Sequence, residues 1–379
     1  MITKDGQNYI MNTYKRYPIT LKNGKGCNVY DHEGNEYLDM ISGIACCPLG
    51  HSNEAIKKAI MESADGFTNI SNLFYTEQQV KLAKKLVEVS GMEKCFFGNS
   101  GTEANEAALK LAIANTKKHE FIACKNAFHG RTFGSLSATW EKKYRTKFKP
   151  LVSKFKFVEY GNTNAIENTI SDKTAAVIIE PIQGEAGIIV PPEDYLKEVQ
   201  EICDKKGVLL IIDEVQTGNG RTGTYFEYLS HSIKPDIVTT AKGLANGLPM
   251  GVAIAKGIDF EPGDHASTFG GNSFVSSVAL TTIETIFKEN LMENAKNIGE
   301  YIKNEIQMLN KKSIKDIRGK GLMIGIELRK NAKEKVAEFI SKKILISVVH
   351  EKTIRLLPPL IINKGEVENF ISSFNEVVK

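Results

Sequence analysis

Apolar and polar positions along the middle of the chain predict strands and helices by turns. Short runs rich in Val, Ile and Leu, bounded by Gly, Pro or charged residues, are typical of strands buried in a parallel sheet. Amphipathic segments of helical period lie between most of these runs. This alternation predicts an α/β fold with a mostly parallel, seven-stranded sheet covered on both faces. The predicted strands are residues 94–97, 121–124, 156–160, 175–180, 208–213, 236–240 and 251–255.

The two ends of the chain follow a different pattern. Apolar and polar residues alternate between residues 17 and 39 around three glycines, which predicts a small antiparallel meander. Its strands are expected at 18–21, 27–31 and 36–39. Helices are expected at 54–65, 77–89, 274–289, 292–309 and 364–378, and further strands at 321–328, 344–349 and 354–357. We therefore expect a large α/β domain formed by residues 51–267, and a smaller α+β domain to which residues 1–50 and 268–379 both contribute.

Composition narrows the class of protein. The 379 residues are 42% hydrophobic and 25% charged, near the average for a soluble globular protein, which argues against disorder. A formal net charge of +4 is small for this length, so we expect no nucleic-acid or membrane partner. The N-terminus has neither the apolar core nor the cleavage site of a signal peptide, and no apolar run reaches the length of a membrane helix. These features predict a cytoplasmic protein.

The cysteines also favour a cytoplasmic protein, and the histidines give no sign of a metal site. Six cysteines are scattered without a C-x-x-C pair, which is typical of free thiols in a reducing compartment. The seven histidines show no ligand spacing, so no metal site is predicted.

Two charged residues follow buried strands at the centre of the pattern. Asp213 ends the run VLLII (208–212), and Lys242 ends the run DIVTTA (236–241). Open α/β sheets bind ligands at the carboxyl ends of their strands. Most lysines are solvated, but Lys242 precedes a loop, 243–249, that has almost no charge. A desolvated lysine has a lowered pKa and becomes a nucleophile, and a cationic heteroaromatic ring forming an imine with it would justify burying both charges.

A strand, a tight turn and an alanine-rich helix start follow one another at residues 96–106. The free N–H groups of the first helical turn, with the hydroxyls of Ser100 and Thr102, predict a phosphate site. A plain helix cap with a glutamate behind it remains the alternative. The glycines of Gly218-x-Gly220-x-x-Gly223 match a dinucleotide motif by letter, but no helix is predicted after them, so we interpret them as a structural loop or lid.

Four further residues are candidates for binding a ligand. Phe128 offers an aromatic face, and Arg131 is suited to a bidentate grip on a carboxylate. Arg355 lies within an apolar strand, where a buried arginine is a second candidate clamp, and Glu185 is a possible partner for it.

These residues lie in motifs that resemble the class III (subgroup II) pyridoxal-phosphate aminotransferases, of fold-type I architecture, along the whole chain. The matching motifs are FGNSGTEANEAALKLA (97–112), FHGRTFG (128–134), EPIQGEAGI (180–188), IIDEVQTGNGRTG (211–223), TTAKGLANGLPMG (239–251), STFGGN (267–272) and IRLLPPL (354–360). Seven motifs in the same order make the resemblance specific. It implies a pyridoxal 5′-phosphate enzyme that moves an amino group to 2-oxoglutarate.

The resemblance implies roles for the residues around the cofactor. Lys242 would hold it as an imine and then carry the proton between substrate and cofactor. Asp213 would pair with the pyridine nitrogen, Gln216 would contact the ring hydroxyl, and Phe128 would stack on the ring. The phosphate would be bound by Ser100, Gly101 and Thr102, and by Thr268 of a neighbouring subunit, which implies a homodimer with shared active sites.

The resemblance also implies how carboxylates are held. Arg131 would grip the α-carboxylate of the donor or a carboxylate of glutamate. Arg355 would hold the other carboxylate of 2-oxoglutarate, with Glu185 as its switchable counter-ion.

Within the class, the chain is most similar to the acetylornithine aminotransferases, which implies N2-acetylornithine as the donor and a place in arginine biosynthesis. Ornithine aminotransferases resemble it almost as strongly, including Tyr14. They carry a tyrosine where this chain has Ile44, and tryptophan where it has His129. Free ornithine, succinylornithine, succinyl-diaminopimelate and 4-aminobutyrate stay open as donors. A catalytically silent pyridoxal-phosphate-binding protein and a nicotinamide oxidoreductase are the rival functions.

Overall fold

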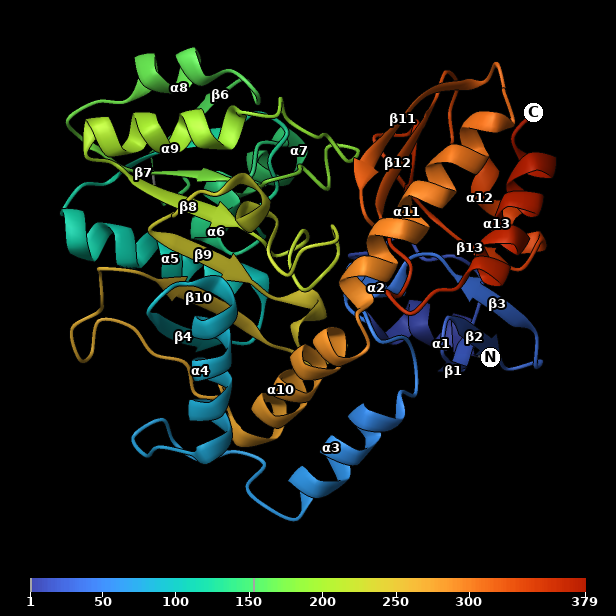
Figure 1. Ribbon diagram of the computed structural model, residues 1–379, viewed down its shortest axis with the longest axis horizontal. Helices are drawn as coiled ribbons and strands as arrows, with labels where there is room; N and C mark the ends of the chain where they lie inside the picture. Colours follow the sequence, from blue (N-terminus) through green and yellow to red (C-terminus); the bar gives the residue numbers. More distant parts are fainter. Residues whose placement is uncertain (1, 153) are drawn as a thin grey trace.

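The computed structural model describes residues 2–152 and 154–379, and its largest element is a seven-stranded sheet (Figure 1). The strand order is β4-β10-β9-β8-β7-β5-β6. Its strands are β4 (Lys94–Gly98), β5 (Glu120–Cys124), β6 (Lys154–Val158), β7 (Thr174–Ile179), β8 (Leu209–Asp213), β9 (Ile237–Thr240) and β10 (Gly251–Ala255). All seven predicted strands are present. The prediction for β6 was two residues too late, because its register on β5 pairs Lys154 with Glu120 and Val158 with Cys124.

The strand directions bring the predicted site residues to one edge. The pairs β5–β6, β5–β7, β7–β8 and β8–β9 are parallel, whereas β10 runs antiparallel to both of its neighbours. Because β4 and β9 are both antiparallel to β10, they point in the same direction. The carboxyl ends of β4, β5, β7, β8 and β9 therefore share one edge, and the predicted mostly parallel α/β sheet is confirmed.

Helices cover both faces of this sheet. Along β8, Ile211 packs with α5 residues on one face, whereas Leu210 and Ile212 belong to the larger core on the other face. The period of two in a strand explains this alternation, and burial on both faces explains the unbroken apolar run. The helices of this region are α3 (Glu54–Ala64), α4 (Glu77–Ser90), α5 (Gly101–Thr116), α6 (Phe133–Ala138), α7 (Lys142–Arg145), α8 (Thr163–Thr169), α9 (Tyr195–Lys206) and α10 (Ser273–Lys288).

The chain ends form two smaller sheets beside the large one (Figure 1). One has the order β1-β2-β3-β13 and the other β11-β12-β15-β14. Their strands are β1 (Leu21–Lys25), β2 (Asn28–Asp31), β3 (Glu36–Asp39), β11 (Ile314–Lys320), β12 (Met323–Leu328), β13 (Ile344–Leu345), β14 (Ser347–Val349) and β15 (Thr353–Leu356). The helices here are α1 (Ile2–Tyr9), α2 (Ser42–Ala45), α11 (Leu291–Met308), α12 (Lys335–Ser341) and α13 (Lys364–Val377).

Among the strands predicted at the chain ends, two differ most from the structure. The first strand of the meander begins at Leu21 rather than at residue 18, because pairing runs from the turn outwards, with Lys25 opposite Asn28. Pro18, which has no N–H, stays outside the ladder. The strand predicted at 344–349 is split at the buried Ile346: β13 pairs with β3, and β14 pairs with β15 in the other sheet.

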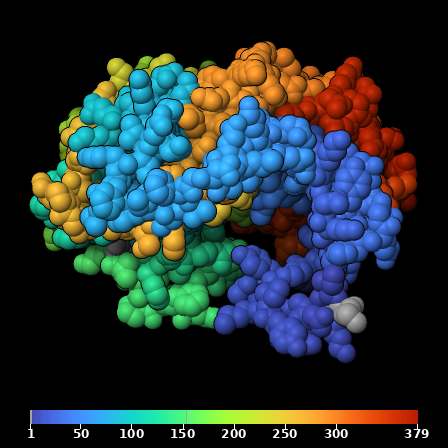
Figure 2. All heavy atoms as spheres, turned by 90° about the horizontal axis from the view of Figure 1, so that it is seen from below, coloured from blue at the N-terminus to red at the C-terminus, as the bar shows by residue number. Residues whose placement is uncertain are grey.

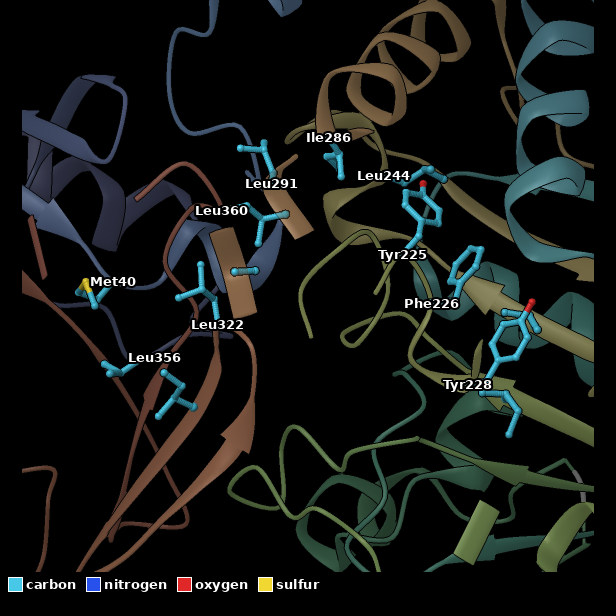
Figure 3. Close-up of a cluster of buried hydrophobic side chains, with 14 of the residues drawn as sticks. Met40, Tyr225, Phe226, Tyr228, Leu244, Ile286, Leu291, Leu322, Leu356 and Leu360 are labelled. Carbon is cyan, nitrogen blue, oxygen red and sulfur yellow. The ribbon is translucent and has the colours of Figure 1, made fainter. Parts of the chain in front are cut away.

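One apolar core connects the large sheet to the chain ends. Figure 3 shows Tyr225, Phe226, Tyr228, Leu244 and Ile286 on the side of the large sheet, and Leu291, Leu360, Leu322, Leu356 and Met40 on the side of the smaller sheets. Both groups belong to the same cluster of buried side chains. The strand ends of the large sheet and the buried β15 are therefore held in a fixed relation.

The N-terminal segment is different in kind. Figure 2 shows it in dark blue, projecting from the body of the molecule and separated from α3 by a hollow. Its large side chains are exposed, with 85% of Tyr9, 85% of Met11 and 72% of Tyr14 accessible. Among the described residues, no helix combines the length and the apolar character needed to cross a membrane.

Candidate active site

A cavity of about 270 Å³ opens at the carboxyl edge of the large sheet. Its walls come from the segments that follow β4, β5, β7, β8 and β9. They include nine of the predicted site residues: Ser100, Gly101, Thr102, Phe128, Arg131, Glu185, Asp213, Gln216 and Lys242. Asn105, His129, Gly130, Glu180 and Val215 complete the lining.

Asp213 is held in one orientation by three hydrogen bonds. Its Oδ2 accepts from Asn105 Nδ2 at 2.8 Å and from His129 Nδ1 at 2.7 Å, and its Oδ1 accepts from the backbone N–H of Val215 at 3.0 Å. A carboxylate only accepts hydrogen bonds, so the proton of the His129 ring lies on Nδ1. The carboxylate is buried, with 4% of Asp213 exposed.

Lys242 begins a short 3₁₀ turn directly after β9, with φ of 47°. The loop around it is anchored by Asn219, whose side-chain amide donates to the carbonyl of Ala241 at 3.0 Å. Burial lowers the pKa of the Lys242 amine below its ordinary value, and the positive charge of Arg355 adds to this against the opposing effects of Glu185 and Asp213. A larger share of neutral amine makes Lys242 a better nucleophile and proton acceptor.

The start of α5 forms the floor of the cavity. Ser100 is the N-cap, and its Oγ accepts from the backbone N–H of Glu103 at 3.3 Å. The helix-cap interpretation is thus correct, and it does not conflict with a phosphate site, because the N–H groups of the first turn have no partner inside the helix. Thr102 Oγ1 is hydrogen-bonded to Thr132 Oγ1 at 2.8 Å and to Ser135 Oγ. A Cβ at Gly130, whose φ is 137°, would lie 2.2 Å from Thr102 Oγ1, so a glycine is required there.

The two arginines reach the site from different directions. Arg131 is an exposed residue of the loop after β5, whereas Arg355 is 3% exposed on β15. Arg355 Nη1 donates to Glu185 Oε1 at 2.5 Å. Burial on its own raises the pKa of the Glu185 carboxyl, but the adjacent Arg355 outweighs this and leaves the pKa below its ordinary value. Glu185 is therefore an ionised partner for Arg355 at neutral pH.

The chemistry of these groups fits pyridoxal phosphate. The N-terminus of α5 suits an anion, Asp213 suits a protonated ring nitrogen, and Lys242 suits an aldehyde. Gln216 is 7% exposed, and within the described chain its Oε1 has no hydrogen-bond partner, so it is an acceptor available to a ring hydroxyl. A Cβ at Gly184 would lie 2.2 Å from this oxygen, which explains why a glycine stands opposite it.

Four predicted residues are not among those that line the cavity. One is Arg355, which is hydrogen-bonded to the lining residue Glu185. Thr268 is exposed and lines a separate surface pocket with Asn72 and Gln79. Tyr14 belongs to the projecting N-terminal segment. Ile44 is 39% exposed, although its neighbour Ala45 lies against the 3₁₀ turn of Lys242, with its carbonyl 3.2 Å from a Cβ built on Gly243. The adjacent Cys46 and Cys47 are half-buried free thiols.

Sequence reasoning did not assign roles to Asn105, His129 and Glu180. The first two lie inside recognised motifs, but no local signal shows that they meet at Asp213. Glu180 accepts from the backbone N–H of Phe128 at 3.0 Å and from that of Gly184 at 3.2 Å. Burial raises the pKa of this carboxyl to about 7. Glu180 thus ties the loop that carries Arg131 to the loop that carries Glu185.

The glycine-rich loop at 218–223 is structural, as predicted. Turns and bends rather than an α-helix follow its glycines, up to a short 3₁₀ helix at Glu227–His231, and its Arg221 is buried. Arg221 Nη1 donates to the carbonyls of Pro358 at 2.5 Å and of Leu322 at 3.3 Å, so the loop fastens the large sheet to the segments around β12 and β15. A nicotinamide site at this loop is therefore rejected.

Comparison with known proteins gives one consistent family. The family model for aminotransferase class-III matches residues 9–378. The acetylornithine aminotransferase of Methanothermobacter thermautotrophicus is 44% identical over 98% of this chain and 96% of its own length. The enzyme of the same name from Caldanaerobacter subterraneus is 42% identical over 100% of this chain and 99% of its own length.

Solved structures agree with the sequence relatives. The acetylornithine aminotransferase from Elizabethkingia anophelis has a TM-score of 0.88 at 30% identity, covering 100% of this chain and 98% of that one. The ornithine aminotransferase from Toxoplasma gondii, described with pyridoxal phosphate at its active site, has a TM-score of 0.95 at 29% identity, covering 100% and 93%. The expected fold-type I architecture is confirmed. The chain belongs to the class-III aminotransferases and is a pyridoxal-phosphate-dependent transaminase.

Proposed function

We propose that this transaminase transfers the δ-amino group of N2-acetylornithine to 2-oxoglutarate, giving N-acetylglutamate 5-semialdehyde and glutamate, as a step of arginine biosynthesis. The observation that carries the proposal is an unequal pair of arginines: Arg131 lines the cavity, and Arg355 is bonded to the lining residue Glu185. Arg355 is neutralised by Glu185 at 2.5 Å, whereas the exposed Arg131 is available to a carboxylate. The names of the relatives described above support the same donor.

Residues around the cavity would hold the cofactor. Ser100, Gly101 and Thr102 would bind its phosphate at the start of α5, and Phe128 would pack on its ring. The Gln216 amide oxygen accepts a hydrogen bond from the ring hydroxyl. Bound pyridoxal phosphate supplies the electron sink that stabilises a carbanion at the reacting carbon of the substrate.

Asp213 and Lys242 do the electrostatic and proton-transfer work. Asp213 would face the ring nitrogen and keep it protonated, and its bonds to Asn105 and His129 fix the orientation of its carboxylate. Lys242 Nζ accepts the proton from the substrate carbon that carries the reacting amino group, and later donates it. Its lowered pKa suits a group that must take up and release a proton near neutral pH.

The two arginines allow one cavity to accept two different acids in turn. Arg131 binds the α-carboxylate of N2-acetylornithine while Glu185 keeps Arg355 neutralised, so that the δ-amino end can approach Lys242. For 2-oxoglutarate, Arg131 binds one carboxylate, Glu185 swings away, and Arg355 binds the other. Bidentate arginine–carboxylate contacts give this recognition its geometric specificity.

We also propose that the active unit is a cytoplasmic homodimer with shared sites. Thr268 would reach the phosphate of the neighbouring subunit, and the exposed N-terminal segment with Tyr14 would pack across the interface. Ile44 would line the substrate entrance beside the Lys242 turn, where an apolar side chain suits a capped amine. The domain limits that we propose from the sequence are 1–50, 51–267 and 268–379.

A panel of amino donors tests the substrate. The purified protein is assayed with 2-oxoglutarate and N2-acetylornithine, ornithine, 4-aminobutyrate, succinylornithine and succinyl-diaminopimelate, and kcat/KM is compared. We expect N2-acetylornithine to have the highest value. A higher value for any of the other donors would overturn the proposal for the donor while leaving the transaminase chemistry intact.

A further inference from the structure

The guanidinium of Arg131 stacks on an aromatic ring rather than pairing with an acid. Within residues 2–152 and 154–379 no salt bridge uses Arg131. Its Cζ lies 3.6 Å from the centre of the Tyr144 ring and 5.3 Å from the centre of the Phe128 ring. The shorter distance is that of direct face-to-face contact, so Tyr144 is the main support of this side chain.

Tyr144 is itself fixed in place. It lies on the short helix α7, is half-buried, and its backbone N–H donates to the carbonyl of Glu141 at 3.1 Å. Its ring meets that of Phe128 edge to face, with centroids 6.3 Å apart and an interplanar angle of 87°. Tyr144 therefore contacts both Phe128 and Arg131, two residues that line the cavity.

We infer that Tyr144 is a positioning residue that holds the Arg131 guanidinium ready for the substrate carboxylate. An exposed arginine on a loop has many rotamers, and ordering them on binding weakens affinity. The flat face of Tyr144 restricts the guanidinium to a plane without competing for its N–H donors, because a ring face binds the cation and leaves the edge of the fork free. Tyr144 thus sets affinity for the carboxylate without touching it.

This inference rests on the proposed role of Arg131, so its test must separate the two. The probe for binding is N-acetyl-L-norvaline, which is N2-acetylornithine without the δ-amino group and cannot react. The probe for catalysis is N-acetyl-1,4-diaminobutane, which is N2-acetylornithine without the carboxylate. The first depends on Arg131, whereas the second does not.

We expect Tyr144→Leu, in the cofactor-loaded protein, to weaken binding of N-acetyl-L-norvaline by about 3- to 30-fold in calorimetry. The same variant raises KM for N2-acetylornithine with little change in kcat, and leaves kcat/KM for N-acetyl-1,4-diaminobutane within about two-fold. Tyr144→Phe, which keeps the ring face, retains wild-type affinity. If Tyr144→Leu does not fold, Tyr144→Met serves in its place.

Tyr301 provides a matched control, because Lys364 Nζ lies 4.9 Å from the centre of its ring on the remote helix α11. Tyr301→Leu is expected to leave the affinity for N-acetyl-L-norvaline unchanged. Wild-type affinity in the variant that removes the ring, Tyr144→Leu or its substitute Tyr144→Met, would overturn the inference, as would an equal loss of kcat/KM for both donors. Absence of N-acetyl-L-norvaline binding by the wild type would instead contradict the proposed function.

Discussion

The loop that carries Arg131 and the strand that carries Arg355 stabilise an arginine cation near the cavity in opposite ways. Arg355 is buried on β15, between β12 and β14, and its charge is neutralised by Glu185. Arg131 is exposed on a loop, and its cation is supported by the rings of Tyr144 and Phe128. Both lie near one cavity, which is lined by Asp213 at the end of β8 and by Lys242 just after the neighbouring β9.

This difference explains how one site could bind N2-acetylornithine and 2-oxoglutarate in turn. An arginine paired with an acid is hidden until that acid moves, because the pair presents little net charge to the cavity. An arginine on an aromatic face keeps its full charge and its donors, so it is available in both half-reactions. In the proposed mechanism the buried Arg355 is the switched residue, and the exposed Arg131 binds a carboxylate in both half-reactions.

The largest effect is expected from Arg355→Gln. The half-reaction with 2-oxoglutarate should slow by about 10²- to 10³-fold, because one carboxylate of this substrate loses its charged partner in a buried position. The half-reaction with N2-acetylornithine should fall by less than about ten-fold, since its donor end does not need the cation. Single-turnover absorbance of the bound cofactor measures the two halves separately. Equal losses in both half-reactions would show that Arg355 does not distinguish the two substrates.

Glu180→Gln tests the link between the two arginine-bearing regions. In the folded protein the pKa of Glu180 is raised to about 7 by burial, against 4.5 for an ordinary glutamate. Between these values the folded state holds a proton that the unfolded state has lost, so the stability of the wild type falls as pH rises through this window. Relative to the variant, the wild type should lose up to about 3 kcal/mol of unfolding free energy.

Urea titrations of both proteins between about pH 5 and pH 8 measure this difference. A constant difference across that range would show that Glu180 is ionised throughout. Its two backbone hydrogen bonds would then be the whole of its role.

Arg131→Gln should affect both half-reactions alike. Loss of one charge-assisted contact is expected to raise KM for N2-acetylornithine and for 2-oxoglutarate by about 10- to 100-fold each. Steady-state kinetics with each substrate varied in turn provide the measurement. A loss confined to one substrate would mean that Arg131, rather than Arg355, is the switched residue.

The smallest effect is expected from Glu185→Gln. With its counter-ion removed, Arg355 presents a cation to the amino end of the donor, so the half-reaction with N2-acetylornithine should slow by about 3- to 10-fold. The half-reaction with 2-oxoglutarate should keep its rate or gain, because no acid has to move. If only the half-reaction with 2-oxoglutarate slowed, the proposed role of Glu185 as the movable counter-ion of Arg355 would be contradicted.

Local patterns were sufficient to predict the sheet and its two charged strand ends. An apolar run that ends at a charged residue, as at Asp213 and Lys242, can be recognised from a few neighbouring residues. The structure has β8 and β9 at these two runs. The run at 251–255 matches β10 residue for residue. By contrast, β11 has the sequence IKDIRGK, in which charged residues and glycine hide the strand, and it was not predicted.

What the sequence could not supply were contacts between distant segments. Asn105 and Asp213 are 108 positions apart, and their hydrogen bond depends on how α5 crosses the sheet. The support of Arg131 by Tyr144 likewise depends on the path of the chain through α6 and α7. The roles of all the predicted site residues stay predictions, and Thr268, Tyr14 and Ile44 do not even line the cavity of the single chain.

The most direct test of the central claim is one turnover with one substrate. N2-acetylornithine is added without 2-oxoglutarate to the cofactor-loaded protein, and the absorbance of the bound cofactor is followed with the release of N-acetylglutamate 5-semialdehyde. We predict one aldehyde per site, recovery of the original spectrum when 2-oxoglutarate is added, and neither change in Lys242→Ala. Turnover in Lys242→Ala at the wild-type rate, or no aldehyde from the wild type, would contradict the account.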